Sequence, residues 1–247
     1  MAKLGLTQAD PIQVAAWGEV SVKTITVLSR KGGTGKTTLA VNLAITAFLD
    51  GHKVMLADLD PQRSASDALR TRKRPGPIFT DSCAGKLFHV QSNAKRDGVE
   101  LLIVDTPAAP ETDVAHAVNL SDLCLVVGRP SFLDLAPIVR SADTVRRLNR
   151  QGLIVLNQAH TNRPEVAAVA FPDVVNALRF CGLPLAPVGL RSRSVFQQAI
   201  AHGQSVGELE PDGAAAHDMS RLWAHLKSAW ALDEHRPDTP ELAARAG

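Results

Sequence analysis

The chain has 247 residues, which is long enough for one large α/β domain with a well-filled core. Its formal net charge is +2, so the composition excludes a uniformly basic surface for nucleic acid. No run approaches the roughly 18 apolar residues of a membrane span, and the N-terminus lacks the basic segment and apolar core of a secretory signal. The sequence therefore predicts a cytoplasmic protein without a membrane span.

The two ends of the chain differ in pattern from the segment between them. Residues 1–20 are mixed in pattern and contain Pro11 and Gly18, which predicts a flexible extension or a small helix packed on the domain. Residues 233–247 are charged and contain prolines, which is typical of a loose tail. The main domain is expected over residues 21–232.

A glycine-rich loop stands between a predicted strand and a predicted helix. Residues 29–38 read Ser-Arg-Lys-Gly-Gly-Thr-Gly-Lys-Thr-Thr, after an apolar, β-branched run at 22–28 and before a helical pattern at 39–49. Glycines let backbone N–H groups converge on an anion, and a helix N-terminus adds partial positive charge. Lys36 is placed to reach the β- and γ-phosphates of a nucleotide, and the Thr37 hydroxyl to bind Mg²⁺.

Acidic residues follow two further predicted strands. The run at 52–57 leads into Asp58 and Asp60, in the order Asp-Leu-Asp-Pro-Gln, and the run at 100–104 leads into Asp105. Carboxyl ends of parallel strands are where open α/β sheets bind ligands. Asp105 is therefore expected to hold Mg²⁺ through water, opposite the phosphate loop.

The rest of the chain alternates between strand and helix patterns. Arg70 to Arg74 form a basic run before Pro-Gly-Pro, which favours a solvated turn over contact with phosphate backbone. Ser131 and Asp134 resemble a capping box at the start of a helix. Other expected helices are 64–69, 164–170, 172–180 and 214–232, and other expected strands are 78–80, 123–127, 153–157 and 185–188. This alternation predicts a predominantly parallel, doubly wound sheet with helices on both faces.

One departure from the general phosphate-loop pattern carries a family resemblance. Arg30 stands where the first glycine is expected, and Lys31 begins the deviant Walker A sequence Lys-Gly-Gly-x-Gly-Lys-Thr. Together with the Asp-x-Asp-Pro-Gln segment and the Asp-Thr-Pro that begins at Asp105, this box resembles the ParA/MinD family, and most closely its small, ParF-like members. The resemblance covers about residues 23–232 and implies a P-loop ATPase fold.

The resemblance also implies roles for single residues. Lys31 would reach the phosphates of a partner subunit, Asp60 would orient the attacking water, and Lys36 would act with them in catalysis. The implied Mg²⁺ ligands are Thr37, Asp58 and Asp105. The implied ATP contacts are Lys31, Gly32, Gly33, Thr34, Gly35, Lys36, Thr37, Thr38 and, for adenine, Asn157, for which a loop-supporting role is an equal alternative.

The function implied is that of a DNA-partition or cargo-positioning ATPase. ATP would close a homodimer that binds DNA non-specifically on the nucleoid, and a small ParB-like adaptor would stimulate an otherwise slow hydrolysis and so release the DNA. Residues 1–20 are too short for a helix-turn-helix domain, so recognition of a DNA site would be left to the partner. The expected DNA contacts are Arg191 and Arg193, with Arg163 and Arg179 as further candidates.

Two other classes of relative remain as alternatives. A MinD-like membrane-cycling ATPase needs a basic amphipathic C-terminal helix, whereas residues 233–247 contain prolines and acidic residues. Lys31 disfavours the ligase-type synthetases of the family. The electron-transfer members carry clustered cysteines, whereas Cys83, Cys124 and Cys181 have no C-x-x-C spacing and are expected to be buried, reduced thiols.

Overall fold

The computed structural model describes residues 22–159 and 172–230. The predicted helix at 164–170, Arg163 and the predicted terminal extensions lie outside these ranges. Within them, no helix is both long and apolar enough to cross a membrane.

A six-stranded sheet forms the centre of the molecule. Its strands are β1 (Lys23–Leu28), β2 (Val54–Asp58), β3 (Ile78–Asp81), β4 (Leu101–Asp105), β5 (Leu123–Gly128) and β6 (Gln151–Leu156). Their order in the sheet is β3-β2-β4-β1-β5-β6, and neighbouring strands all pair in parallel. The predicted fold class is confirmed. The order places β1 between β4 and β5, so the loop after β1 lies beside the carboxyl end of β4.

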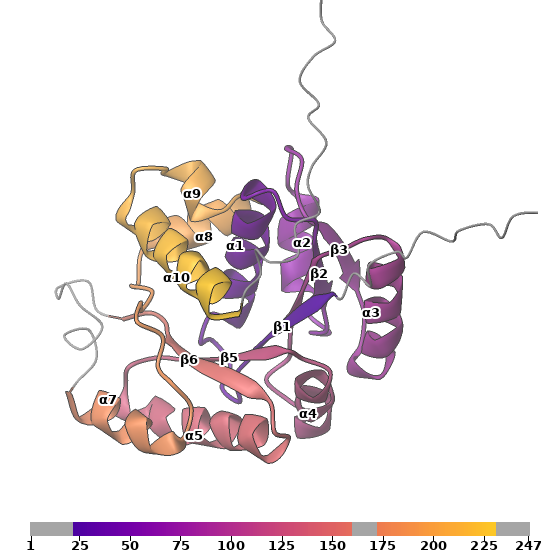
Figure 1. Cartoon of the computed structure of the whole chain (residues 1–247). Coiled ribbons are helices and arrows are strands. Elements are labelled where there is room, and N and C mark those ends of the chain that lie inside the picture. The colour runs from indigo at the N-terminus through magenta and orange to yellow at the C-terminus, as the bar shows by residue number, and fades with distance from the viewer. Residues whose placement is uncertain (1–21, 160–171, 231–247) are drawn as a thin grey trace, which may run out of the picture.

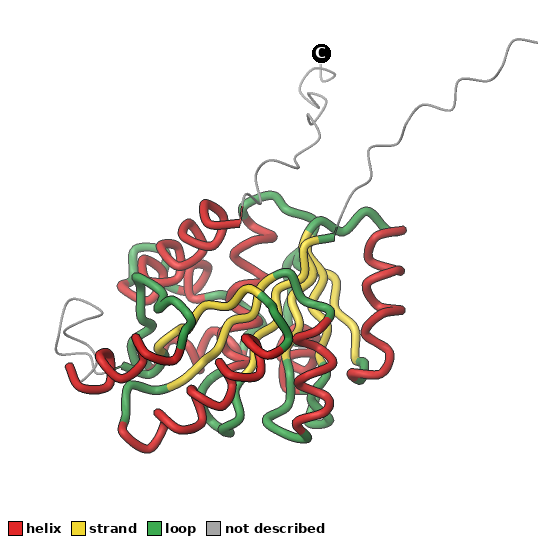
Figure 2. The backbone as a smooth tube through the Cα atoms, turned by 60° about the horizontal axis from the view of Figure 1, so that its bottom comes forward, coloured by secondary structure: helices red, strands yellow, loops and turns green. Residues whose placement is uncertain are grey.

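Helices cover both faces of this sheet (Figures 1 and 2). On one face lie α1 (Lys36–Leu49), α2 (Ser64–Arg70), α8 (Ser194–Ala201), α9 (Val206–Leu209) and α10 (Ala214–Trp230). On the other lie α3 (Leu87–Arg96), α4 (Glu111–Asn119), α5 (Phe132–Arg147) and α7 (Pro172–Leu178), with the short 3₁₀ turns η1 (Ala84–Lys86) and η2 (Arg179–Cys181). Side chains alternate along each strand, so Leu101 and Ile103 enter the first layer while Leu102 and Val104 enter the second.

Two local predictions are wrong. The segment 185–188 is not a strand: it runs along β6 and forms an isolated bridge from Leu185 to Ile154. Pro184 has no N–H to donate to β6, and after Ala186, which donates to Ile154, the next residue to donate to β6 is Leu190, so no continuous ladder forms. Cys83 is exposed in the connection between β3 and η1, whereas Cys124 and Cys181 are buried as expected.

Candidate functional site

The loop between β1 and α1 has the backbone shape of an anion-binding loop. Gly33 and Gly35 have φ angles of +72° and +89°, which are accessible to glycine at little cost. Gly35 is also the N-cap of α1, and it carries no side chain to cap the helix. The N–H groups of the first turn are therefore left for an anion, in line with the positive end of the helix dipole.

A cavity of about 710 Å³ opens beside this loop. It lies where the carboxyl ends of the strands meet α1, as the order of the strands requires. Its walls come from the loop, the β2–α2 connection and the segment after β4. Among the lining residues are Gly32, Gly33, Gly35, Lys36, Thr37, Thr38, Asp60, Pro107 and Ile200.

Lys36 and Asp60 place opposite charges on the cavity wall. Lys36 is 7% exposed, and burial lowers the pKa of its ammonium although the charges of Asp105 and Asp60 act to raise it. Asp60 follows β2, and its Oδ1 accepts a hydrogen bond from the backbone N–H of Gln62 at 2.9 Å. That bond fixes the carboxylate at the mouth of the cavity, where a water could be held in line with a phosphate.

Thr37 and Asp105 form a contact suited to Mg²⁺. The Thr37 hydroxyl donates to Asp105 Oδ2 at 2.7 Å. Burial raises the pKa of Asp105 to about 7, and its Oδ1 has no hydrogen-bond partner among the described residues. A hydroxyl and a carboxylate are oxygen ligands of the kind that Mg²⁺ binds, directly or through water. The residues present therefore fit a magnesium ion, which would also satisfy the unpaired oxygen.

Asp58 accepts hydrogen bonds from the turn that follows β2. Its carboxylate accepts the backbone N–H groups of Asp60, at 3.1 Å, and of Ser66, at 2.9 Å. It lies in register with Asp105 on the neighbouring strand, and burial raises its pKa. The contacts of Asp58 thus shape the turn that carries Asp60, and its expected place near Mg²⁺ stays a prediction.

Lys31 does not line the nucleotide cavity of its own chain. Its ammonium lies 3.0 Å from Oδ2 of Asp134, a buried residue at the start of α5. Burial acts to raise the pKa of Asp134, but hydrogen bonds from Ser131 and Lys31, with Arg129 nearby, lower it overall. The predicted capping box is wrong, because the Ser131 hydroxyl bonds to the Asp134 side chain and not to the helix backbone.

Further contacts hold the loop in place. Arg30 forms an ion pair with Glu111 of α4 and donates to the Thr144 hydroxyl of α5 at 3.1 Å. The side chain of Asn157 donates to the Thr34 carbonyl at 2.8 Å, and Gln158 donates to the Gly33 carbonyl at 2.9 Å. A Cβ atom at Gly35 would lie 2.2 Å from Asn157 Nδ2, so the close approach requires glycine.

These loop contacts show what the sequence analysis missed. The loop-supporting alternative for Asn157 matches its contacts, and its adenine contact stays a prediction. Glu111, Asp134 and Gln158 were not identified as neighbours of the loop. Gln158 directly follows Asn157, which the sequence does indicate as a site residue. No local sequence pattern indicates that Glu111 contacts the loop.

Comparison with known proteins identifies the family. A family model described as the CobQ/CobB/MinD/ParA nucleotide binding domain matches residues 25–228. The maintenance of carboxysome distribution protein A of Gloeobacter kilaueensis is 31% identical over 218 residues, covering 84% of this chain and 95% of that protein. This chain belongs to the ParA/MinD family of ATPases.

Other relatives agree with membership of the ParA/MinD family. The chromosome-partitioning ATPase Soj of Thermus thermophilus is 46% identical over 55 residues, which are 22% of each chain. The septum site-determining protein MinD from Pyrococcus horikoshii, solved with Mg-ADP, superposes with a TM-score of 0.68 at 18% identity, covering 85% of this chain and 98% of that one. At that identity the structural match shows a shared fold.

The basic residues predicted to contact DNA do not form one cluster in this family member. Arg193 is paired with Asp218 of α10 at 2.7 Å, and Arg191 is partly buried beside Ala159. Arg179 belongs to η2, which packs with α5 on the opposite face of the sheet. Arg163 lies outside the described residues. A DNA-binding role for these arginines stays a prediction.

Proposed function

We propose that this protein is a cargo-positioning ATPase of the ParA type. ATP closes a homodimer, the dimer binds DNA without sequence preference, and a small ParB-like adaptor stimulates an otherwise slow hydrolysis and release. The observation that carries the proposal is the deviant phosphate loop, whose Lys31 lies outside its own nucleotide cavity. The named activities of relatives support positioning as the general task, since one distributes carboxysomes and another partitions chromosomes.

The residues of the loop and the three aspartates have separate roles in the proposed reaction. The loop N–H groups and Lys36 bind the phosphates, and Asp60 orients the attacking water. Thr37 and Asp105 would hold Mg²⁺, which neutralises charge that develops on the transferred phosphoryl group. Asp58 holds the turn that carries Asp60, through the two backbone N–H groups that it accepts.

Dimerisation gives Lys31 its role in the proposal. In one subunit the Lys31 ammonium is paired with Asp134, and its side chain is 28% exposed. Exchange of Asp134 for a phosphate of the partner's ATP replaces one charge-assisted hydrogen bond of Lys31 by another. Arg129 and Ser131 remain beside Asp134 after Lys31 leaves, so that carboxylate keeps hydrogen-bond donors.

The experiment that tests the proposal is co-sedimentation with DNA in the presence of ATP, ADP or no nucleotide. We expect binding of DNA of any sequence with ATP and weak binding with ADP. Anionic lipid vesicles form a second arm. Absence of ATP-dependent DNA binding would contradict the proposal. ATP-dependent sedimentation with the vesicles would favour the membrane-cycling alternative.

A further inference from the structure

A second cavity, of about 420 Å³, lies between the α2–β3 turn and the α8–α9 turn. Its polar walls are Arg72, Lys73 and Arg74 from the first turn, and His202 and Gln204 from the second. The residues that line the nucleotide cavity do not line this one. The α2–β3 turn also precedes the amino end of β3, whereas the nucleotide loop follows the carboxyl end of β1. An occupant here would therefore leave the nucleotide cavity free.

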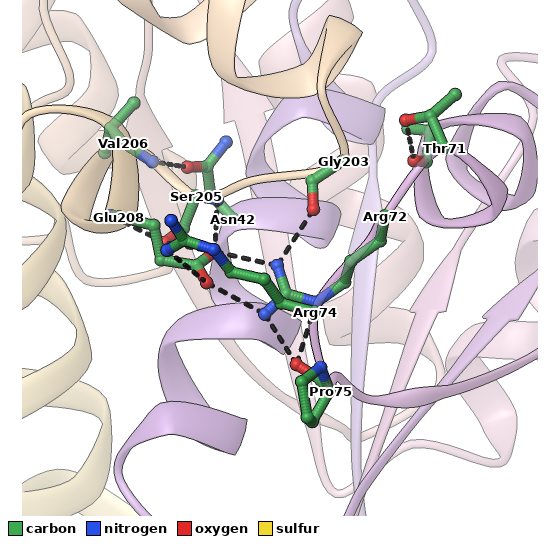
Figure 3. A network of polar contacts seen from close by, with 10 residues as sticks. Asn42, Thr71, Arg72, Arg74, Pro75, Gly203, Ser205, Val206 and Glu208 are labelled. Atoms are coloured by element: carbon green, nitrogen blue, oxygen red, sulfur yellow. Dashed lines mark hydrogen bonds and ion pairs between the residues drawn. The ribbon is translucent and has the colours of Figure 1, made fainter.

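Arg72 builds the wall of this cavity and does not serve as a free cation. Its guanidinium donates two hydrogen bonds to the Glu208 carboxylate, both of 2.8 Å, and others to the carbonyls of Gly203 and Pro75 (Figure 3). The side chains of Arg72 and Glu208 are 5% and 6% exposed. The favoured prediction of a fully solvated basic run is therefore wrong for Arg72, while Arg70 pairs with Asp67 and Asp81.

The opposite wall is held as firmly. Gly203 has a φ of +62°, and a Cβ atom there would lie 2.5 Å from the backbone nitrogen of Arg72, so the two turns pack backbone against backbone. Ser205 and Glu208 form a capping box at the start of α9. The first N–H of α9, from Val206, donates to Asn42 of α1 at 2.8 Å (Figure 3). The segment Gly203–Val206 thus fixes the cavity to the domain core.

The positive charge left over at this cavity is exposed. Lys73 is exposed and has no ion pair among the described residues, and Arg74 is 61% exposed, 3.9 Å from Glu208. Three cationic side chains therefore line the cavity, whereas the one carboxylate beside it, that of Glu208, is already covered by two hydrogen bonds from Arg72. His202 and Gln204 add donors: the ring of His202 is exposed, with Nδ1 2.7 Å from the Gln198 carbonyl. A hollow with surplus cations and further hydrogen-bond donors suits an anion with several oxygens, such as a phosphate.

We propose that this basic pocket, defined by Lys73, Arg74, His202 and Gln204, binds phosphate groups of the DNA backbone; the inference rests on the proposed function and gives it a contact surface. Separate cations and donors around a hollow match spaced phosphates. A bilayer surface calls instead for an apolar face beside the charges. The neighbouring helix α8 turns its apolar side chains inward, with Val195, Phe196 and Ala199 buried in the core.

The test removes the two exposed charges and leaves Arg72 in place. The variant Lys73→Ala with Arg74→Ala is compared with Lys86→Ala with Arg96→Ala. The control also removes two exposed cations, but from η1 and α3 on the other face of the sheet. Binding of fluorescent duplex DNA is titrated with ATP at salt concentrations between about 50 and 200 mM. ATP-dependent dimerisation and basal ATPase activity, both expected to be unchanged, show that each variant is folded.

We expect the pocket variant to bind DNA more weakly than the wild type and with a shallower dependence on salt. Removal of one phosphate-binding side chain should lower the salt slope by about 1. For each side chain removed, the loss of affinity between about 50 and 200 mM salt should therefore be smaller by a factor of about four. The variant Lys73→Glu with Arg74→Glu should bind more weakly still. The control should keep both the affinity and the slope.

Three results would overturn the inference. Unchanged affinity and slope in the pocket variant, with normal binding by the wild type, would reject the pocket and leave the proposed function standing. Equal losses in the pocket and control variants would mean that net charge alone matters. If the wild type binds anionic vesicles but not DNA, or binds neither, both the pocket's partner and the proposed function fail.

Discussion

Asp105 shows how one buried carboxyl group can couple metal binding to pH. Its pKa is raised to about 7 by burial at the carboxyl end of β4, and its Oδ1 has no partner in the described part of the chain. Near neutral pH the group is therefore partly protonated without metal. Because a carboxylate binds Mg²⁺ in its ionised form, metal binding should release a proton there.

The expected consequence is a pH-dependent stability of the metal-free protein. The folded pKa lies above the unfolded one, so the protonated group stabilises the fold fully below about pH 4, and this stabilisation is lost as pH rises through about 7. Thermal unfolding in EDTA between pH 5 and pH 8 measures it. The variant Asp105→Asn should lose this part of the dependence, and an unchanged pH profile in that variant would contradict the assignment.

Lys36 and Lys31 should separate binding from dimerisation. Lys36→Ala removes the buried cation of the cavity and should abolish useful ATP binding. Lys31→Ala removes a side chain directed at Asp134, so ATP binding by the monomer should persist while the ATP dimer weakens and hydrolysis slows. Nucleotide titration and sizing with a slowly hydrolysed ATP analogue distinguish the two. The trans role of Lys31 is wrong if Lys31→Ala dimerises and hydrolyses like the wild type.

At the scale of elements, buried polar contacts join α1, α9 and the α2–β3 turn. Asn42 of α1 accepts from Val206 and donates to the Thr38 carbonyl at 2.9 Å. The Arg72–Glu208 pair joins the turn to α9. Burial alone would raise the pKa of Glu208, but hydrogen bonds from Arg72 and the Ser205 backbone lower it overall. Helix α1, which begins at the phosphate loop, is therefore linked through α9 to the turn that forms the wall of the basic pocket.

Loss of Arg72 should therefore destabilise the fold strongly. Arg72→Ala leaves Glu208 buried without its main partner, which should cost about 3–5 kcal/mol of unfolding free energy. Arg70→Ala is the matched control, because Arg70 makes exposed ion pairs with Asp67 and Asp81 and should cost about 1 kcal/mol or less. Urea denaturation of both variants measures the difference. Similar midpoints would mean that the Arg72–Glu208 pair contributes little.

The elements and the site were predictable to different degrees. Apolar runs such as 101–104 predict buried strands because each residue there faces a covered side of the sheet. The nucleotide loop and its aspartates are also local patterns. The partners of Lys31 and Asn42 lie 103 and 164 residues away in the sequence, so their proximity depends on the whole fold. The strand expected at 185–188 is absent because Ala186 alone of these residues donates to β6, and Pro184 before it has no N–H to donate.

At the scale of the whole molecule, the balanced charge makes dimerisation decisive for the DNA binding that we propose. A net charge of +2 attracts DNA only weakly. Two copies of a local basic patch are therefore needed for binding that withstands the weakening effect of salt. The basic pocket supplies one such patch, and Arg191 and Arg193, as expected from the sequence, would supply another. A homodimer carries two copies of each patch, so it should neutralise twice as many phosphates as a monomer.

Asp60→Ala provides the state in which this doubling can be measured. The variant loses the carboxylate at the cavity mouth but keeps Lys36 and the Thr37–Asp105 contact, so it should bind ATP, hydrolyse it slowly and accumulate as a dimer. With ATP, its DNA affinity should fall with salt about twice as steeply, on a logarithmic scale, as that of the ADP-bound monomer. Fluorescence anisotropy at several salt concentrations, with sizing at each, measures both slopes.

Asp105→Ala is the comparison variant. It should weaken Mg²⁺-dependent nucleotide binding itself, so its DNA affinity should keep the shallow salt dependence of the monomer. If both variants lose ATP affinity equally, Asp60 and Asp105 do not have separate roles; equal slopes for dimer and monomer would show that DNA binding does not depend on pairing two subunits.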